Sequence, residues 1–377
     1  MAGIYIHIPF CRQACHYCDF HFSTSLKTKD QVLAAMVQEL HLQRDYLDQE
    51  RVETVYFGGG TPSLLEKDEI LLLLEGVYKN FDVSPSAEVS MECNPDDLNP
   101  AKLAELKELG INRLSIGVQS FRDEDLKLMN RAHKASEATR SVQQAQEAGF
   151  DNLTIDLIYA IPDLSRQAWI DNVDHAISLG VQHISSYCLT FEDGTAFGKW
   201  INAGTMKAVE DEHASEQFML LVERLKKAGI EQYEVSNFAR KGYESKHNSA
   251  YWNSTPYLGI GPSAHSFDGS SRQWNLAHNV KYSKAFAEGL TWYEKEILTP
   301  AAKFNEYMMT GLRTVKGVDL GRIKRDFGVD LAGANSAELQ QLKDRKEATL
   351  EAGQLSLTKK GLLRADAIAS DFFIIES

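Results

Sequence analysis

The chain up to Gly229 repeats one pattern six times: a short, mainly apolar run, a turn, and a longer stretch with helical periodicity. The expected strands are Ile4–Pro9, Val52–Phe57, Ala87–Glu92, Arg113–Gln119, Asn152–Tyr159 and Ile184–Phe191. The expected helices are Lys29–Gln49, Lys67–Lys79, Pro100–Leu109, Ser136–Ala148, Arg166–Leu179 and Glu210–Lys227. Strands that alternate with helices pair in parallel through right-handed crossovers. The pattern therefore predicts an α/β fold with a parallel sheet, either doubly wound or curved into an incomplete barrel.

The pattern changes after Gly229. Residues 230–299 are rich in aromatic residues and glycine, with expected strands at Tyr233–Asn237 and Tyr257–Gly261. Beyond them we expect three helices, a short strand with a turn, and a final helix. These elements are Ala301–Thr314, Leu320–Phe327, Glu338–Ala352, Gln354–Thr358 and Leu362–Phe372. We therefore expect three parts, residues 1–229, 230–299 and 300–377, of which the last is a small, mainly helical, winged-helix-like domain.

Composition narrows the classes of function. The formal net charge of −13 argues against a nucleic-acid partner, which would require a concentrated basic face. No apolar run is long enough to span a bilayer, and the N-terminus lacks the pattern of a secretion signal, although peripheral membrane contact stays open. The five cysteines do not resemble a disulfide framework, and two of them, Cys93 and Cys188, are expected to be buried apolar residues. We expect a cytoplasmic protein.

Three cysteines stand in one short loop directly after the first expected strand: Cys11, Cys15 and Cys18. A [4Fe-4S] cluster normally takes four thiolates, one on each iron, so three thiolates would leave one iron open to a non-protein ligand. A zinc site is the alternative, because Cys3His sites also use closely spaced cysteines. The histidines available for such a site are His7, His16 and His21.

A glycine-rich run, Phe57-Gly58-Gly59-Gly60-Thr61-Pro62, follows the second expected strand. Consecutive glycines let the backbone approach a ligand closely, and their exposed peptide groups can bind an amino or carboxylate group. Such a run is also common where a tight turn joins a strand to a helix. Together with the cysteine loop, it indicates a small-molecule site at the carboxyl ends of the strands.

The spacing C-x3-C-x2-C resembles the cluster signature of the radical S-adenosylmethionine (SAM) superfamily. This resemblance implies a six-unit partial barrel, (β/α)6, in which the open iron binds the amino and carboxylate groups of SAM. Gln119, Asp156 and Arg131 match positions of the branch that is similar to coproporphyrinogen oxidase. There, the residues that match Gln119 and Asp156 are expected to bond the ribose hydroxyls of SAM, and the residue that matches Arg131 is expected to pair with the methionine carboxylate. The residues that match SAM-binding positions are Tyr5, Tyr17, Gly59, Gly60, Thr61, Glu92, Gln119, Arg131 and Asp156. Taken singly, each is equally consistent with a strand-end cap or a surface ion pair.

Two branches of this superfamily fit the chain. In oxygen-independent coproporphyrinogen III oxidase the signature continues to a fourth cysteine, where this chain has Phe20. The oxidase also has a long N-terminal arm before its first strand, whereas the first expected strand of this chain begins at Ile4. The run His247-Asn248-Ser249-Ala250-Tyr251-Trp252 instead matches the HNxxYW motif associated with heme binding in the HemW heme-chaperone family. A histidine beside aromatic residues is also often a packed structural residue.

The HemW resemblance implies that His247 ligates heme iron and that Tyr251 and Trp252 pack on the macrocycle. His265 is a weaker ligand candidate, and the residues placed in sequence to meet the heme propionates are Arg240, Lys241 and Lys246.

The leading prediction is a heme chaperone that binds a [4Fe-4S] cluster, SAM and heme and delivers heme to acceptor proteins, with no assured catalytic residue. The first alternative is the oxidase, in which an electron donor would drive radical decarboxylation of coproporphyrinogen III. The second is a zinc-stabilised binding protein without radical chemistry.

Overall fold

The computed structural model describes residues 1–375 and contains a parallel sheet of six consecutive strands. They are β1 (Ala2–Ile8), β2 (Val52–Gly59), β3 (Val83–Cys93), β4 (Arg113–Gln119), β5 (Leu153–Tyr159) and β6 (His183–Cys188). Each strand pairs in parallel with the next one along the chain. The sheet does not close, because β1 continues to β9 (Tyr257–Ile260) and β6 to β8 (Asn237–Ala239). The predicted α/β partial barrel is therefore confirmed.

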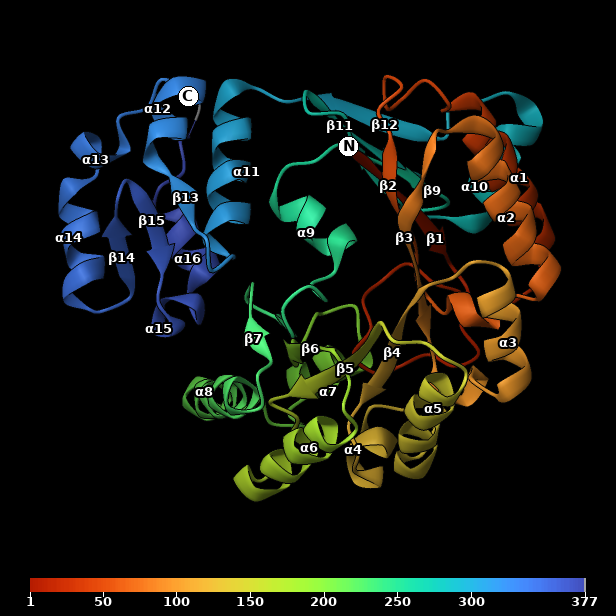
Figure 1. The fold of residues 1–377 in the computed structure, drawn as a ribbon, viewed down its shortest axis with the longest axis horizontal. Coiled ribbons are helices and arrows are strands. Elements are labelled where there is room, and N and C mark those ends of the chain that lie inside the picture. The colour runs from red at the N-terminus through yellow and green to blue at the C-terminus, as the bar shows by residue number, and fades with distance from the viewer. Residues whose placement is uncertain (376–377) are drawn as a thin grey trace.

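Helices cover the outer face of this sheet (Figure 1). They are α1 (Lys29–Leu42), α2 (Lys67–Asn80), α3 (Pro100–Glu108), α5 (Ala135–Glu147), α6 (Arg166–Ser178) and α8 (Asp211–Lys227). The shorter α4 (Asp123–Leu128) and α7 (Ala196–Asn202) contact the cysteine loop, where His16 Nδ1 lies 2.9 Å from Leu128 O and Phe197 N donates to His16 O at 3.0 Å. Their starts follow from local sequence: the side chain of Asn99 accepts from Lys102 N at 3.0 Å, and Ser165 accepts from Ala168 N at 3.2 Å. The first helix ends at Leu42, before its predicted end at Gln49, and residues 43–49 form turns.

The segment between residues 230 and 299 extends both ends of the sheet. Its elements are β7 (Glu231–Gln232), β8, α9 (Lys246–Trp252), β9, β10 (His265–Phe267), β11 (Ser271–Asn275), α10 (Asn279–Glu288) and β12 (Tyr293–Ile297). The prediction of one strand at Tyr233–Asn237 is wrong. A turn separates β7 from β8, because the Glu234 carboxylate accepts from Ser236 N at 2.9 Å and from the Asn237 amide at 2.5 Å.

The C-terminal part has its own three-stranded sheet and its own hydrophobic cluster, which includes Phe304, Met308 and Ile368. Its elements are α11 (Pro300–Leu312), β13 (Val318–Asp319), α12 (Leu320–Phe327), α13 (Leu331–Ala334), α14 (Ser336–Asp344), β14 (Ala348–Glu351), β15 (Gln354–Leu357), α15 (Lys359–Leu362) and α16 (Ala365–Ser370). Figure 1 shows this mainly helical unit to one side of the barrel.

Two predicted helices of this part are corrected. The helix expected at Glu338–Ala352 stops at Asp344, because Lys346 adopts a φ of 58° and the chain then enters β14, which pairs with β15. Within the expected final helix Leu362–Phe372, only α16 (Ala365–Ser370) is a separate helix, and α15 precedes it and ends at Leu362. The division of the chain into three parts stays a prediction.

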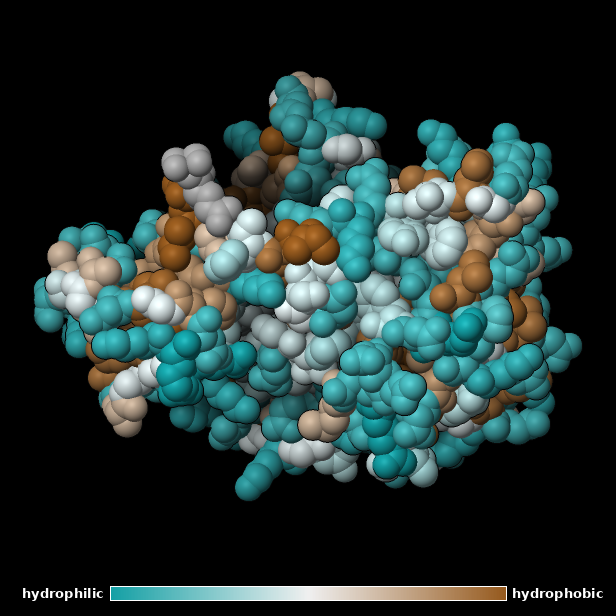
Figure 2. Space-filling view, turned by 90° about the horizontal axis from the view of Figure 1, so that it is seen from above, coloured by the Kyte–Doolittle hydropathy of each residue, from teal (hydrophilic) through white to brown (hydrophobic). Residues whose placement is uncertain are grey.

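The face seen in Figure 2 is mainly hydrophilic, with hydrophobic residues in small groups rather than in one large patch. Within residues 1–375, no helix combines the length and the apolar character needed to cross a membrane.

A buried carboxylate joins α1 to the extension of the sheet. Glu39 is 0% exposed and accepts four hydrogen bonds, from Gly261 N at 2.8 Å, Asn275 Nδ2 at 2.6 Å, Trp292 Nε1 at 3.0 Å and the Tyr282 hydroxyl. Sequence patterns gave no sign of this contact, since its partners lie more than two hundred residues further along the chain.

We expect Glu39→Gln to lower the free energy of unfolding by about 2 kcal/mol or more, because an amide cannot accept from all four donors. Burial raises the pKa of Glu39 from 4.5 to about 7. A carboxyl whose pKa is raised by folding stabilises the fold fully below its unfolded pKa and loses that contribution as the pH rises through the folded value. The gap between wild type and Glu39→Gln should therefore be widest below pH 4.5 and should shrink steadily as the pH rises from 4.5 to about 7.

Urea unfolding across this pH range measures the gap. The exposed Glu75→Gln is the control and should show no such trend. A gap that stays constant with pH would contradict the assignment of the titration to Glu39.

Candidate functional site

A cavity of about 1430 Å³ opens at the carboxyl ends of the barrel strands and reaches the C-terminal part. Its walls include the three cysteines and all but one of the predicted SAM-binding residues: Cys11, Cys15, Cys18, Tyr17, Gly59, Gly60, Thr61, Glu92, Gln119, Arg131 and Asp156. Tyr5 is not on the wall and lies behind it. The opposite wall carries charged residues of the C-terminal part: Arg313, Glu347, Lys360, Arg364 and Asp366. This volume exceeds that of a typical small-molecule site, so the cavity has room for more than one ligand.

The cysteine loop follows β1 and is held in place by backbone hydrogen bonds. Cys11 N donates to Ser23 O at 3.1 Å, and His16 N donates to Met129 O at 3.1 Å. All three thiols are partly exposed, and burial raises the pKa of Cys18 to about 11. A metal that binds here must therefore displace protons from these thiols.

The histidines proposed for a zinc site are bonded within the fold. His7 Nε2 lies 2.9 Å from His21 O, His16 Nδ1 lies 2.9 Å from Leu128 O, and His21 Nε2 lies 2.8 Å from Asn279 Oδ1. Within the described part of the chain, no three Cys, His, Asp or Glu side chains converge as a single ion would require. The three thiols line the same cavity, and a cluster would offer each thiolate a separate iron.

The glycine-rich turn packs directly against the cysteine loop. Gly59 has a φ of 109°, and a Cβ atom there would lie 2.7 Å from the His7 ring. A Cβ atom on Gly60 would lie 2.6 Å from the carbonyl oxygen of Phe10 and 3.0 Å from Cys11 Sγ. Only glycine fits at these two positions, so the turn and the cysteine loop form one surface.

Arg131 brings a positive charge to the cysteine loop. Its guanidinium donates to Asn94 Oδ1 and to Gly117 O, both at 2.8 Å, and lies 3.3 Å from Cys15 Sγ. Its Nε atom is buried and has no hydrogen-bond partner among the described residues. A carboxylate beside the cysteine loop would satisfy such a guanidinium.

Two carboxyl groups line the cavity wall. Burial raises the pKa of Glu92 to about 7 and that of Asp156 to about 6. Glu92 accepts from Gly59 N at 3.1 Å, and Asp156 accepts from the Ser115 hydroxyl at 3.3 Å. A cationic ligand nearby would favour the ionised forms of both groups, so the pair suits a ligand that carries positive charge and hydroxyl groups.

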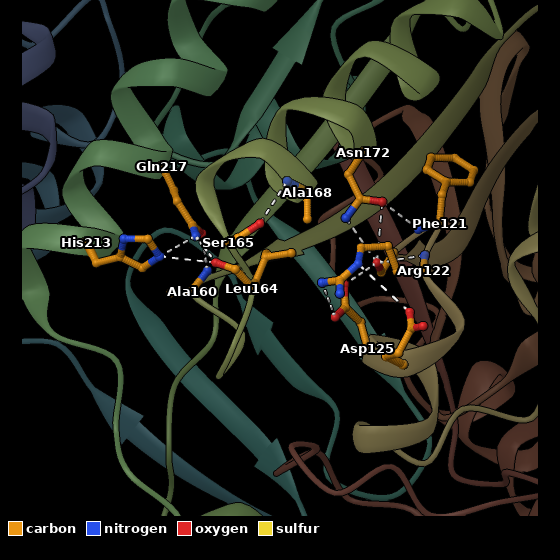
Figure 3. A network of polar contacts seen from close by, with 12 residues as sticks. Phe121, Arg122, Asp125, Ala160, Leu164, Ser165, Ala168, Asn172, His213 and Gln217 are labelled. Carbon is orange, nitrogen blue, oxygen red and sulfur yellow. Dashed lines mark hydrogen bonds and ion pairs between the residues drawn. The ribbon is translucent and has the colours of Figure 1, made fainter.

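Figure 3 shows the polar network beneath the ends of β4 and β5. Gln119 and Ala160, at the ends of these strands, adopt φ angles of 66° and 59°, which are uncommon for residues other than glycine. The Gln217 side chain accepts from Ala160 N at 2.8 Å, and Asn172 accepts from Phe121 N at 2.8 Å. Sequence reasoning missed these two buried amides; their signal was a polar residue on the apolar face of an amphipathic helix.

The residues of the HNxxYW motif lie away from the cavity wall, on α9. His247 is 2% exposed; its Nδ1 lies 2.8 Å from Thr54 Oγ1 and its Nε2 lies 2.9 Å from the Tyr251 hydroxyl. Burial lowers the pKa of His247 to about 3, so the ring is neutral. Trp252 lies beneath the Arg313 guanidinium, 5.4 Å from the ring centroid. The motif therefore does not line the cavity, although the His247 ring stacks on Tyr5, with ring centroids 6.3 Å apart.

Other predicted residues have mixed outcomes. Cys93 is buried as predicted, but the prediction for Cys188 is wrong, because it is exposed at the end of β6 on the cavity wall. His265 is exposed and stacks on Trp274 with ring centroids 6.4 Å apart. Of the three basic residues, only Arg240 makes a side-chain hydrogen bond among the described residues, to Ala228 O at 3.1 Å, and none of the three lines the cavity.

Comparisons with known proteins identify the family of the chain. A sequence model of the Radical SAM superfamily matches residues 5–176, and one of the HemN C-terminal domain matches residues 298–364. The heme chaperone HemW of Bacillus subtilis is 34% identical over 99% of both chains. That of Mycobacterium tuberculosis strain H37Rv is 36% identical over 97% of this chain and 93% of its own. The chain belongs to the HemW family of the radical SAM superfamily.

The fold of this HemW family member also resembles a solved enzyme structure. Coproporphyrinogen III oxidase (HemN) from Escherichia coli, a radical SAM enzyme, superposes with a TM-score of 0.84 over 99% of this chain and 90% of its own, at 23% identity. Identity this low supports the shared fold alone. Phe20, two residues after the last cysteine of the loop, is 72% exposed on the cavity wall.

Proposed function

We propose that this chain is a heme chaperone that holds a [4Fe-4S] cluster, SAM and heme and passes the heme to acceptor proteins. The observation that carries the proposal is the single cavity in which three thiols, a glycine-rich turn and a buried guanidinium meet, in a chain of the HemW family.

The side chains of this cavity suit the two cofactors. Cys11, Cys15 and Cys18 would hold three irons of the cluster, which when bound supplies one open iron to the amino and carboxylate groups of SAM. Arg131 would pair with that carboxylate and Glu92 would face the amino group. The remaining residues proposed for SAM are Tyr5, Tyr17, Gly59, Gly60, Thr61, Gln119 and Asp156.

Anaerobic reconstitution with iron and sulfide, followed by parallel measurement of heme binding and 5′-deoxyadenosine release, tests the function. A chaperone should bind heme, with a shifted Soret band, and release little 5′-deoxyadenosine. Formation of protoporphyrinogen from coproporphyrinogen III at useful turnover would instead select the oxidase. A colourless protein with zinc and no acid-labile sulfide would reject the cluster.

The assignment of heme to His247, Tyr251 and Trp252 remains a prediction. Both ring nitrogens of His247 are hydrogen-bonded, so ligation of iron requires the bond to Thr54 or to Tyr251 to break and α9 to move. We expect His247→Ala to weaken heme binding by about tenfold or more, because an axial ligand is lost. Titration of heme followed at the Soret band measures the affinity.

His265→Ala is the matched control for the heme prediction, since His265 is an exposed imidazole that stacks on an aromatic ring outside the motif. Equal heme affinity of wild type and His247→Ala, with a loss in His265→Ala, would transfer the ligand role to His265.

A further inference from the structure

The HNxxYW helix α9 packs on the inner face of the barrel wall, opposite the face of β1 and β2 that α1 and α2 cover (Figure 1). Two side chains of the wall hold its first turn. The carboxylate of Glu88 on β3 accepts from Lys246 N at 2.9 Å and from His247 N at 3.3 Å, and Thr54 on β2 bonds the His247 ring at 2.8 Å. The imidazole is therefore oriented by the barrel itself.

The His247 ring stacks on Tyr56 of β2, with ring centroids 4.9 Å apart and planes inclined by 18°. Tyr5 of β1 lies beside both rings, with its centroid 6.2 Å from that of Tyr56 and 6.3 Å from that of His247. The rings are closely packed against β2, because a Cβ atom on Gly58 would lie 2.8 Å from the Tyr5 ring and 3.0 Å from the Tyr56 ring. Tyr56 is thus held in one orientation from several sides.

Tyr56 connects this stack to the glycine-rich turn. Its hydroxyl donates to one oxygen of Glu92 at 2.9 Å, and the other oxygen of Glu92 accepts from Gly59 N at 3.1 Å. A continuous line of contacts therefore runs from the motif histidine to the backbone that we propose to bind SAM.

We propose that His247 is a positioning residue for the SAM pocket, which acts by fixing Tyr56 and, through Glu92, the backbone at Gly59. The inference rests on the proposed binding of SAM. Without the stacked imidazole, Tyr56 gains rotational freedom and Glu92 loses a fixed donor, so ligand binding must first order both side chains. The heme motif and the SAM pocket are then energetically coupled, and a movement of α9 changes the affinity for SAM.

The test compares SAM dissociation constants of His247→Gln, Tyr56→Phe and the double variant, by equilibrium dialysis of protein with matched iron and sulfide content. Each single change should weaken SAM binding by about tenfold. The double variant should be no more than about threefold weaker than either single one, because the two residues act in series.

His183→Gln is the matched control. His183 is 0% exposed and its Nε2 lies 2.8 Å from the Tyr233 hydroxyl, so its replacement costs a comparable buried contact. It borders a small internal cavity together with Tyr56 and Glu92 but makes no hydrogen bond to either. It should bind SAM as wild type does. Wild-type affinity in His247→Gln, or equal losses in His247→Gln and His183→Gln, would overturn the proposal.

Hydrogen exchange of the cofactor-free protein provides a readout that does not need SAM. In His247→Gln the amide of Gly59 should exchange about tenfold faster than in wild type, because its acceptor Glu92 is no longer held in place. In His183→Gln its exchange rate should equal that of wild type. Unchanged exchange in His247→Gln would overturn the positioning role. If cluster-loaded wild type does not bind SAM, the proposed function fails, and the exchange rates alone then decide on the positioning role.

Gly3→Ala is the alternative variant if His247→Gln does not fold, because it leaves the His247 imidazole in the chain. Its new Cβ atom would lie 2.8 Å from Thr54 Oγ1 and 3.3 Å from the His247 ring, so it should displace the ring and speed Gly59 exchange. Exchange at the wild-type rate in folded Gly3→Ala would count against the proposal.

Discussion

Replacement of Cys15 by Ser should abolish the [4Fe-4S] cluster and, with it, SAM binding. Two thiolates cannot hold three irons, and the nearby imidazoles of His7, His16 and His21 are bonded to other groups of the fold. The loss in cluster affinity should exceed the roughly 10–100-fold that removal of an outer-shell partner costs a metal site. Iron and acid-labile sulfide content after anaerobic reconstitution, with the visible absorbance, measures it.

Cys188→Ser provides the control for this result. Cys188 is an exposed thiol on the same cavity wall but lies outside the cysteine loop. Its replacement should leave iron, sulfide and SAM binding at wild-type levels. Wild-type iron and sulfide content in Cys15→Ser would reject a cluster held by this loop.

Gly60→Ala should remove most of the cluster although every thiol is still present. The new Cβ atom would lie 2.6 Å from Phe10 O, 2.9 Å from Ile8 O and 3.0 Å from Cys11 Sγ. Two of these atoms belong to the backbone, which cannot move aside as the end of a side chain can, so the loop that carries Cys11 must shift. We expect lower iron and sulfide content and a loss of about 1–3 kcal/mol in the free energy of unfolding.

The control for overpacking is Gly194→Ala, whose nearest atom is Oδ1 of the exposed Asp19, at 3.3 Å. That carboxylate can rotate away, so cluster content and urea unfolding should match wild type. If Gly60→Ala and Gly194→Ala were equally competent in reconstitution, close packing of the glycine-rich turn on the cysteine loop would have no functional role.

The candidate cavity could be predicted from the sequence because its parts are local. The cysteine spacing, the glycine-rich run and single polar residues such as Glu92 and Asp156 each stand at the end of an expected strand. The carboxyl ends of parallel strands meet at one edge of a sheet, so short-range patterns were enough to place these residues together.

The errors arose where partners far along the chain decide the conformation. Residues of β14 continue a helical pattern, yet pairing with β15 makes them a strand. The seven-residue helix α9 was missed because its burial depends on Glu88 and Thr54, which lie 159 and 193 residues away from His247. Glu39 was passed over for the same reason.

The order of the six barrel strands, the cysteine loop and the strand-end residues were thus determined by the sequence alone, since periodicity and spacing are properties of neighbouring residues. Only the tertiary structure decided that the motif histidine is buried behind Tyr56 instead of facing the cavity. The physical reason is that the burial and the hydrogen-bond partners of a side chain depend on residues that folding brings together from distant parts of the chain. Short-range sequence patterns do not reveal these contacts.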